Sequence, residues 1–135
     1  SGKTVVREHL ENAAFDISGF NYMDGSGLSR SHTVTPIAQV TFLSSLMDKN
    51  YFKNYFDSLP VGGQSGTLKR MFAGSGYGSV FAKTGTLNKV KALTGYMKTN
   101  TGKTLVFSIL VNNYSGSVDM VKNRIERILQ PALDL

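Results

Sequence analysis

The chain has 135 residues, the length of one ordinary domain, and 41% of them are hydrophobic, which is enough to build a core. It contains no cysteine, so a disulfide framework, a thiolate zinc site and a cysteine nucleophile are excluded. The net charge is +6, but the basic residues are scattered along the chain and form no run of like charges. This scatter favours a solvated basic face over a nucleic-acid-binding surface.

The first part of the chain predicts two helices joined by a loop. Apolar residues at helical spacing predict an amphipathic helix over residues 4–14. A strong turn signal follows at residues 24–27. Thr35 and Pro36 have the pattern of a helix N-cap with proline at the first helical position, and the helix is expected to run to about Lys49. Its expected apolar face is Ile37, Val40, Leu43 and Met47.

A shorter helix is expected over residues 51–58, where it ends before Pro60. Its aromatic residues are expected in the core: Phe52, Tyr55 and Phe56. The glycine-rich residues 61–78 are expected to form a loop. Gly62, Gly63 and Gly66 indicate first a shaped loop and second part of a cleft wall.

The periodicity changes after residue 78, and the remainder predicts three strands and a helix. The strands are expected at residues 79–84, 89–98 and 103–112, with a hairpin turn at 99–102. Residues 89–98 alternate between two faces, Val90, Ala92, Thr94 and Tyr96 on one and Lys89, Lys91, Leu93 and Gly95 on the other. A helix over 118–129 closes the chain, with Val118, Val121, Ile125 and Ile128 on one face and Pro131 after it. This order predicts an α+β fold in which helices cover three antiparallel strands.

Several familiar site patterns are absent. Residues 102–104 resemble the end of a phosphate loop, but the glycine expected five residues before the Gly-Lys pair is replaced by Met97. The glycines of residues 74–78 lack the spacing of a dinucleotide loop. His9 and His32 are isolated from other metal-ligating residues, so no metal cofactor is expected, and His9 is expected on the surface.

The segment Lys83-Thr84-Gly85 suggests a site that recognises a carboxylate. A lysine on a strand edge can hold a carboxylate, and a threonine hydroxyl can donate a hydrogen bond to the same group. The glycine leaves room for a substrate along the edge, and the N–H of Thr86 can point at a developing oxyanion. The alternative interpretation is an ordinary polar hairpin.

Four segments in order give this motif a context: DGSGLSR at 24–30, LPVGGQSGTL at 59–68, AKTGTL at 82–87 and VFSILVNNY at 106–114. With them, the chain resembles the C-terminal part of the DacB-type penicillin-binding D-Ala-D-Ala carboxypeptidases, peptidase family S13, over nearly its whole length. The resemblance implies part of a β-lactamase/transpeptidase-like fold and a serine acyl-enzyme mechanism on peptidoglycan peptide stems, without metal or organic cofactor. It also implies a periplasmic or other extracytoplasmic location and acylation of the intact parent by β-lactams.

The resemblance assigns roles to individual residues. Lys83 and Thr84 would hold the terminal carboxylate beside Gly85, and the N–H of Thr86 would form half of the oxyanion hole. Ser26 and Arg30 are candidates for substrate contact because their loop is expected near the cleft. A structural interpretation of that loop is favoured, however, in which Asp24 accepts backbone hydrogen bonds and glycines adopt positive φ.

The chain departs from the family pattern in one respect. No serine is followed by lysine three residues later or by asparagine two residues later, so the S-x-x-K and S-x-N motifs are missing. We therefore expect residues 1–135 to form a single partial domain, inactive alone, whose exposed sheet needs the N-terminal part of the parent or a second copy. Two alternatives remain open: a non-catalytic peptide- or cell-wall-binding module of the same fold, and a plain β-lactamase, which the DGSGLSR and SGTL segments fit less well.

Overall fold

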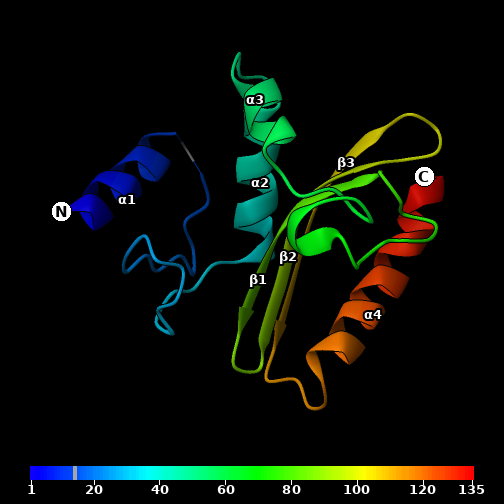
Figure 1. The fold of residues 1–135 in the computed structure, drawn as a ribbon. Helices are drawn as coiled ribbons and strands as arrows, with labels where there is room; N and C mark the ends of the chain where they lie inside the picture. The colour runs from blue at the N-terminus through cyan, green and yellow to red at the C-terminus, as the bar shows by residue number, and fades with distance from the viewer. Residues whose placement is uncertain (14) are drawn as a thin grey trace.

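The computed structural model describes residues 1–13 and 15–135, which form a three-stranded antiparallel sheet with helices on both faces (Figure 1). The helices are α1 (Gly2–Asn12), α2 (Pro36–Leu46), α3 (Phe52–Asp57) and α4 (Val118–Leu129), with 3-10 turns η1 (Gly66–Leu68) and η2 (Gln130–Asp134). The strands are β1 (Val80–Leu87), β2 (Val90–Lys98) and β3 (Thr104–Asn112). The predicted α+β arrangement is confirmed; the predicted end of the first helix, at Ala14, lies outside the described residues.

The sheet has the order β1-β2-β3, and both pairs are antiparallel. One row across it is formed by Lys83, Thr94 and Ser108. The alternation predicted for residues 89–98 is confirmed, since Leu93 packs with the α4 core and Tyr96 with the α2 core. Strand β1 continues past the expected end at residue 84, because the motif keeps pairing with β2 up to a tight turn.

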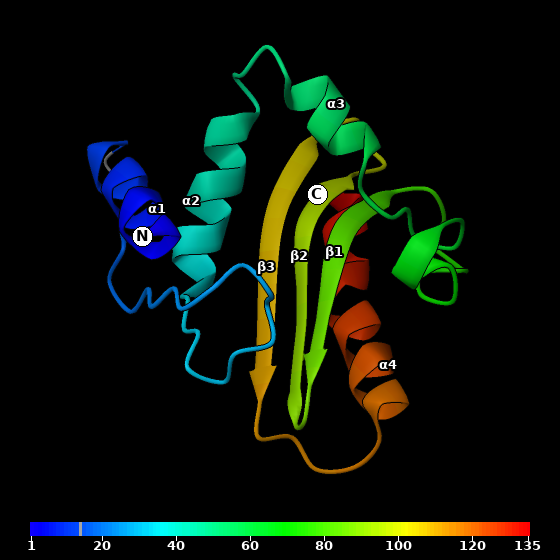
Figure 2. The ribbon, with the colours of Figure 1, turned by 60° about the vertical axis from the view of Figure 1, so that its left-hand side comes forward.

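The larger core lies between the sheet and α4 (Figure 2). Ser117 caps α4 by accepting a 3.2 Å hydrogen bond from the Met120 N–H, and the helix spans the expected residues. Its buried side chains are Val121, Ile125 and Leu129. The expected face was wrong at Ile128, which is 65% exposed, because the sheet contacts a stripe with i, i+4, i+8 spacing.

The smaller core lies between the sheet, α2 and α3. The predicted Thr35 cap is confirmed, since its hydroxyl accepts from the Ala38 N–H at 3.2 Å, but α2 ends at Leu46 rather than Lys49. Its buried residues are Leu43 and Leu46. Ile37 and Met47, expected in the core, are exposed, because α2 is apolar all round and the sheet contacts only one side of it. The aromatic residues of α3 are half-buried around the fully buried Tyr96: Phe52, Tyr55 and Phe56.

Residues 61–78 are more ordered than the expected loop. Their first part runs beside β1, where the Gly62 N–H donates to the Val80 carbonyl at 2.8 Å and the Ala82 N–H donates to the Pro60 carbonyl at 3.1 Å. Gly63 has φ +73°, and a Cβ there would lie 2.5 Å from the Tyr77 ring, so this position requires glycine. The shaped-loop interpretation of these glycines is thereby confirmed.

Helix α1 buries none of its residues. A cavity of about 740 Å³ lies between α1, residues 15–34 and α2, and its lining is mainly apolar. His9 is exposed on α1, as expected. Among the described residues, no helix has both the length and the apolar character needed to cross a bilayer.

Candidate carboxylate-recognition site

The site is built on the outer edge of β1. The hydrogen bonds at Val80 and Ala82 show that even-numbered residues of β1 direct their backbone groups away from β2, whereas the Ser79 carbonyl accepts from the Lys98 N–H on the β2 side. Because this direction alternates along a strand, the N–H groups of Thr84 and Thr86 point out from the sheet. Past Ala82, no strand pairs with this edge in the described part of the chain.

Lys83 and Thr84 project from opposite faces of the sheet, as neighbours on a strand must. Lys83 is exposed on the α2 face, and its Nζ donates a 2.8 Å hydrogen bond to the Thr84 carbonyl. A ligand at the edge itself is therefore accessible to the lysine from one face and to the threonine hydroxyls from the other. Gly85 faces the same side as Lys83, and a Cβ there would meet Ala92 at an ordinary 3.4 Å.

On the α4 face, both threonine hydroxyls have polar partners. The Thr84 hydroxyl donates to the Thr67 hydroxyl of η1 at 2.9 Å. The Thr86 hydroxyl accepts from the Lys91 Nζ at 2.6 Å. Thr67 lies in the SGTL segment that the sequence analysis named. Its contact with Thr84 was not predicted, because the two residues are 17 positions apart and no local pattern indicates that they meet.

Lys91 was expected on a solvated basic face, and this expectation was wrong. It is only 4% exposed, because it projects from β2 toward the α4 side of the sheet. Burial lowers the pKa of Lys91 below its ordinary value, and the positive charges of Lys122 and Lys83 lower it further. The alternating pattern that placed Lys91 on the Leu93 face was the available signal of this burial.

A polar cluster crosses the α2 face beside Lys83. The Gln39 Oε1 of α2 accepts hydrogen bonds from the Thr94 hydroxyl at 3.0 Å and the Ser108 hydroxyl at 2.7 Å. The two hydroxyls lie 3.1 Å apart. This cluster ties α2 to β2 and β3, in the row of the sheet that ends at Lys83.

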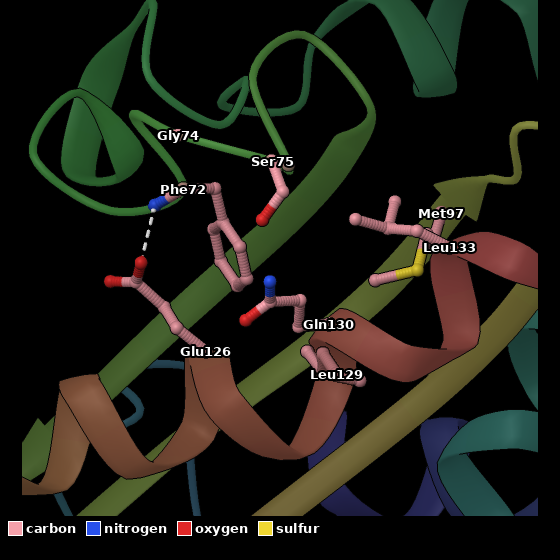
Figure 3. A pocket seen from close by; sticks show the side chains of 9 residues that line it. Phe72, Gly74, Ser75, Met97, Glu126, Leu129, Gln130 and Leu133 are labelled. Atoms are coloured by element: carbon pink, nitrogen blue, oxygen red, sulfur yellow. Dashed lines mark hydrogen bonds between the residues drawn. The ribbon is translucent and has the colours of Figure 1, made fainter.

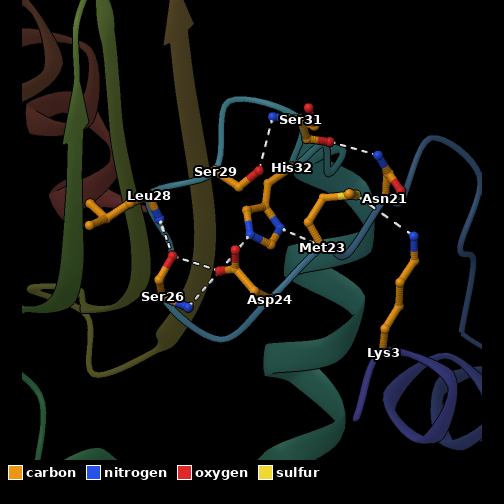
Figure 4. Close-up of polar contacts among 9 residues, drawn as sticks. All are labelled: Lys3, Asn21, Met23, Asp24, Ser26, Leu28, Ser29, Ser31 and His32. Atoms are coloured by element: carbon orange, nitrogen blue, oxygen red, sulfur yellow. Dashed lines mark hydrogen bonds and ion pairs between the residues drawn. The ribbon is translucent and has the colours of Figure 1, made fainter. Parts of the chain in front are cut away.

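The loop with the candidates Ser26 and Arg30 is a hydrogen-bonded turn (Figure 4). The Asp24 carboxylate accepts from the Ser26 N–H at 2.8 Å and from its hydroxyl at 2.6 Å, and Gly27 has φ +70°, so the structural interpretation is confirmed. These bonds hold the pKa of Asp24 below its ordinary value, with a smaller contribution from His32.

The structure does not bring these two residues into contact with the strand edge. Among the described residues, no hydrogen bond or ion pair joins Ser26 or Arg30 to residues 83–86, and Arg30 is exposed. The Ser26 hydroxyl instead accepts from the Leu28 N–H at 3.0 Å. A role for either residue in substrate contact stays a prediction.

A small cavity of about 80 Å³ lies between residues 72–76 and α4 (Figure 3). Here the Glu126 carboxylate accepts a 2.9 Å hydrogen bond from the Phe72 N–H, where φ is +59°. None of the predicted site residues lines this cavity. The contact holds the glycine-rich loop against α4.

Comparison with known proteins identifies the family that the chain resembles. A sequence model described as D-Ala-D-Ala carboxypeptidase 3 (S13) family matches residues 1–131. A D-alanyl-D-alanine carboxypeptidase from Actinomadura sp. (strain R39) is 39% identical over 122 residues, covering 86% of this chain and 22% of that protein.

Solved structures show the same fold. Penicillin-binding protein 4 from Haemophilus influenzae, complexed with a β-lactam, matches with a TM-score of 0.87 and 25% identity over 99% of this chain and 33% of that one. A penicillin G-acylated predatory endopeptidase from Bdellovibrio bacteriovorus matches with a TM-score of 0.64 and 25% identity over 90% of this chain and 36% of that one. The chain thus spans a third or less of the penicillin-binding protein and of the Actinomadura carboxypeptidase.

Proposed function

The chain belongs to the D-Ala-D-Ala carboxypeptidase 3 (S13) family, and we propose that it forms the substrate-recognition edge of a serine-type D-Ala-D-Ala carboxypeptidase or endopeptidase. The substrate would be a peptidoglycan peptide, so the protein would act outside the cytoplasmic membrane. The observation that supports this most directly is the open edge of β1, which combines Lys83, two threonine hydroxyls and outward-pointing N–H groups.

Each group on the edge has a role in the proposed reaction. The Lys83 ammonium attracts the terminal carboxylate, and the Thr84 hydroxyl, released from Thr67, donates a hydrogen bond to it. Gly85 lets the peptide backbone lie against the strand. The outward N–H of Thr86 donates to the carbonyl oxygen under attack and stabilises the charge that develops there.

The nucleophile is proposed to lie elsewhere in the parent protein, because no serine of this sequence stands in an S-x-x-K or S-x-N motif. Its hydroxyl oxygen would attack the scissile carbonyl while a neighbouring lysine accepts the proton. The leaving D-alanine amine then takes a proton, and water hydrolyses the acyl-enzyme ester. The second N–H of the oxyanion hole would be that of the nucleophile.

The rest of the parent is also proposed to cover the apolar cavity between α1 and α2. This chain covers 22% of the Actinomadura carboxypeptidase and 33% of the penicillin-binding protein, so a large part of each lies outside the match. Exposed apolar side chains gather on or beside these helices: Val5, Ile37, Phe42, Met47 and Tyr51. A dye that fluoresces on apolar surfaces should bind this chain strongly and the full-length protein weakly. If this chain instead forms a dimer that does not bind the dye, a second copy of the chain covers the cavity.

The role of Lys83 is tested in the full-length gene product by the rate of penicillin acylation. Lys83→Ala should slow acylation by about tenfold to a hundredfold, since an interaction with a charged group is worth about 1.5–3 kcal/mol. Lys89→Ala is the matched control, because Lys89 is exposed in the turn that follows β1. Equal acylation rates for the two variants would refute the role of Lys83.

A non-catalytic module that binds peptides or cell-wall anions is the second candidate, because this sequence lacks the nucleophile motifs. The two functions differ in one simple property of the parent. An upstream S-x-x-K followed by S-x-N in the full-length sequence supports the enzyme. Their absence, together with retained binding of a D-Ala-D-Ala peptide, supports the module.

A further inference from the structure

One buried charged group has no role in the proposed reaction. Lys91 lies on β2 directly opposite Thr86, and its Nζ donates a 2.6 Å hydrogen bond to the Thr86 hydroxyl. A lysine that is 96% buried normally has a carboxylate partner. Among residues 1–13 and 15–135, no ion pair includes Lys91. Its recorded partner is a neutral hydroxyl on the edge of β1.

The electrostatic surroundings make this arrangement costly. Lys122 of α4 and Lys83 of β1 are both close enough to lower the pKa of Lys91, in addition to the effect of burial. Asp119 of α4 is paired with Lys122, at 2.9 Å from the Lys122 Nζ. Lys91 therefore has no counter-charge of its own among the described residues. An anion bound at the edge would supply one.

We propose that Lys91 is a positioning residue for the terminal carboxylate of the substrate, which it serves through Thr86 and not by direct contact. This inference rests on the proposed function of the β1 edge. The carboxylate would lie between two positive charges, with Lys83 on the α2 face and the Thr86–Lys91 pair on the α4 face.

The hydrogen-bond directions support this role. An ammonium can only donate, so the Thr86 hydroxyl accepts from Lys91 and keeps its own proton for another acceptor. Thr86 is exposed, so that proton is available to a ligand at the edge. Lys91 fixes the side chain of Thr86 and polarises its hydroxyl, which strengthens the hydrogen bond that Thr86 can donate.

The test uses the full-length protein and two peptides that end in D-Ala-D-Ala, one with a free carboxylate and one with a terminal amide. Lys91→Met removes the charge while keeping an unbranched side chain, Lys91→Arg keeps the charge, and Lys89→Met is the exposed control in the same hairpin. Lys91→Met should lower kcat/KM for the carboxylate peptide about tenfold, mainly through KM, and leave the amide peptide unchanged. Lys91→Arg should restore most of the loss.

Equal losses on both peptides, or no loss on either, would overturn the proposal. The melting temperature separates this role from a folding role, since replacing an unpaired buried charge by methionine should leave the melting temperature unchanged or raise it.

Binding of N-acetyl-D-alanine and its amide gives a readout without turnover. If the wild-type protein cleaves neither peptide but prefers the carboxylate ligand, and Lys91→Met abolishes that preference, the proposed enzyme fails while the role of Lys91 stands. If Lys91→Met keeps the preference, the role of Lys91 is refuted.

Discussion

The Thr84 hydroxyl donates a 2.9 Å hydrogen bond to the hydroxyl of Thr67, and this bond ties the 3-10 turn η1 to the strand that carries the proposed site. The residues just before this turn are also held to the strand, since the Gly62 N–H donates to the Val80 carbonyl and the Ala82 N–H donates to the Pro60 carbonyl. The position of the open edge thus depends on a segment that precedes it by a dozen residues or more.

Removing this contact should weaken substrate recognition without unfolding the protein. Thr67→Val in the full-length protein preserves shape but removes the hydroxyl that can donate to the Thr84 oxygen once the Thr84 proton turns to the carboxylate. A hydrogen bond of this kind contributes about 0.5–1.5 kcal/mol, so KM for a carboxylate substrate should rise about two- to tenfold. Thr104→Val, at an exposed position at the start of β3, is the control. Indistinguishable KM values for the two variants would show that Thr67 does not position Thr84.

Gly95 should be essential for the packing of β1 on β2. A Cβ at this position would lie 2.2 Å from the Phe81 carbonyl oxygen and 2.6 Å from the Ala82 Cα, which is too close without movement of the strand. Gly95→Ala should therefore lower the free energy of unfolding by about 1–3 kcal/mol or more, measured by urea denaturation.

Gly85→Ala is the matched comparison on the neighbouring strand, because its Cβ would meet only an ordinary contact. This variant should keep its unfolding free energy within about 1 kcal/mol. In the full-length protein it should still slow acylation, since the new methyl group occupies the edge where the substrate is proposed to lie. Unfolding free energies that agree between the two variants would contradict this account of the sheet.

Tyr96 should make stability fall at high pH. Its hydroxyl is buried and donates to the Leu43 carbonyl at 2.8 Å, and burial, with a smaller contribution from Tyr55, raises its pKa to about 12. The unfolded chain ionises at the ordinary value of 10.0, so this contribution is complete below pH 10 and is lost as pH rises toward 12. Urea denaturation across this range should show less loss in Tyr96→Phe than in the wild type.

At neutral pH the same substitution should have the opposite effect. Tyr96→Phe leaves the Leu43 carbonyl without its donor in a buried position, which costs about 1–3 kcal/mol. Tyr77→Phe is the control, because Tyr77 is 59% exposed. A Tyr96→Phe protein as stable as Tyr77→Phe at pH 7 would contradict the structural role of this hydroxyl.

The loop around Asp24 should loosen in acid. Hydrogen bonds from Ser26 lower the pKa of Asp24 below the ordinary 3.8, so their stabilisation is complete above that value and lost as pH falls through the lower, folded pKa. An NMR pH titration of the Ser26 amide should show a midpoint below 3.8, and Asp24→Asn should abolish it. Asp48→Asn should leave the titration unchanged. A midpoint at or above 3.8 would show that the turn does not depend on the carboxylate.

Strands and helices could be predicted from the sequence where their apolar residues recur at a regular spacing. The positions of the strands and of α4 followed from alternation and helical spacing. Leu93 and Tyr96 of β2 alternate between the two cores, and the buried residues of α4 recur every four positions. The expected face of α2 was wrong because its apolar residues surround the helix, and only packing against the sheet determines that Leu46 is buried and Ile37 is not. Residues 61–78 were expected as a loop because their pairing with β1 has no periodic signal.

The site could be predicted only in part, because some of its contacts join segments that are far apart in the sequence. The roles proposed for Lys83, Thr84 and Thr86 came from their residue types and from the resemblance to a family, and they stay predictions. The contacts made by Thr67 and Lys91 depend on pairing between segments that are distant in the sequence or on opposite strands. A lysine in a strand is usually exposed, so the burial of Lys91 could be established only once the position of α4 was known.

The most direct test of the central claim is the intact mass of this chain and of the full-length gene product after incubation with a penicillin. The account predicts a penicillin-sized adduct on the full-length protein and none on this chain, because it proposes that the recognition edge lies here and the nucleophile elsewhere in the parent. An adduct on this chain would contradict the assignment by showing that a nucleophile lies within residues 1–135. No adduct on either protein would contradict the acyl-enzyme function itself.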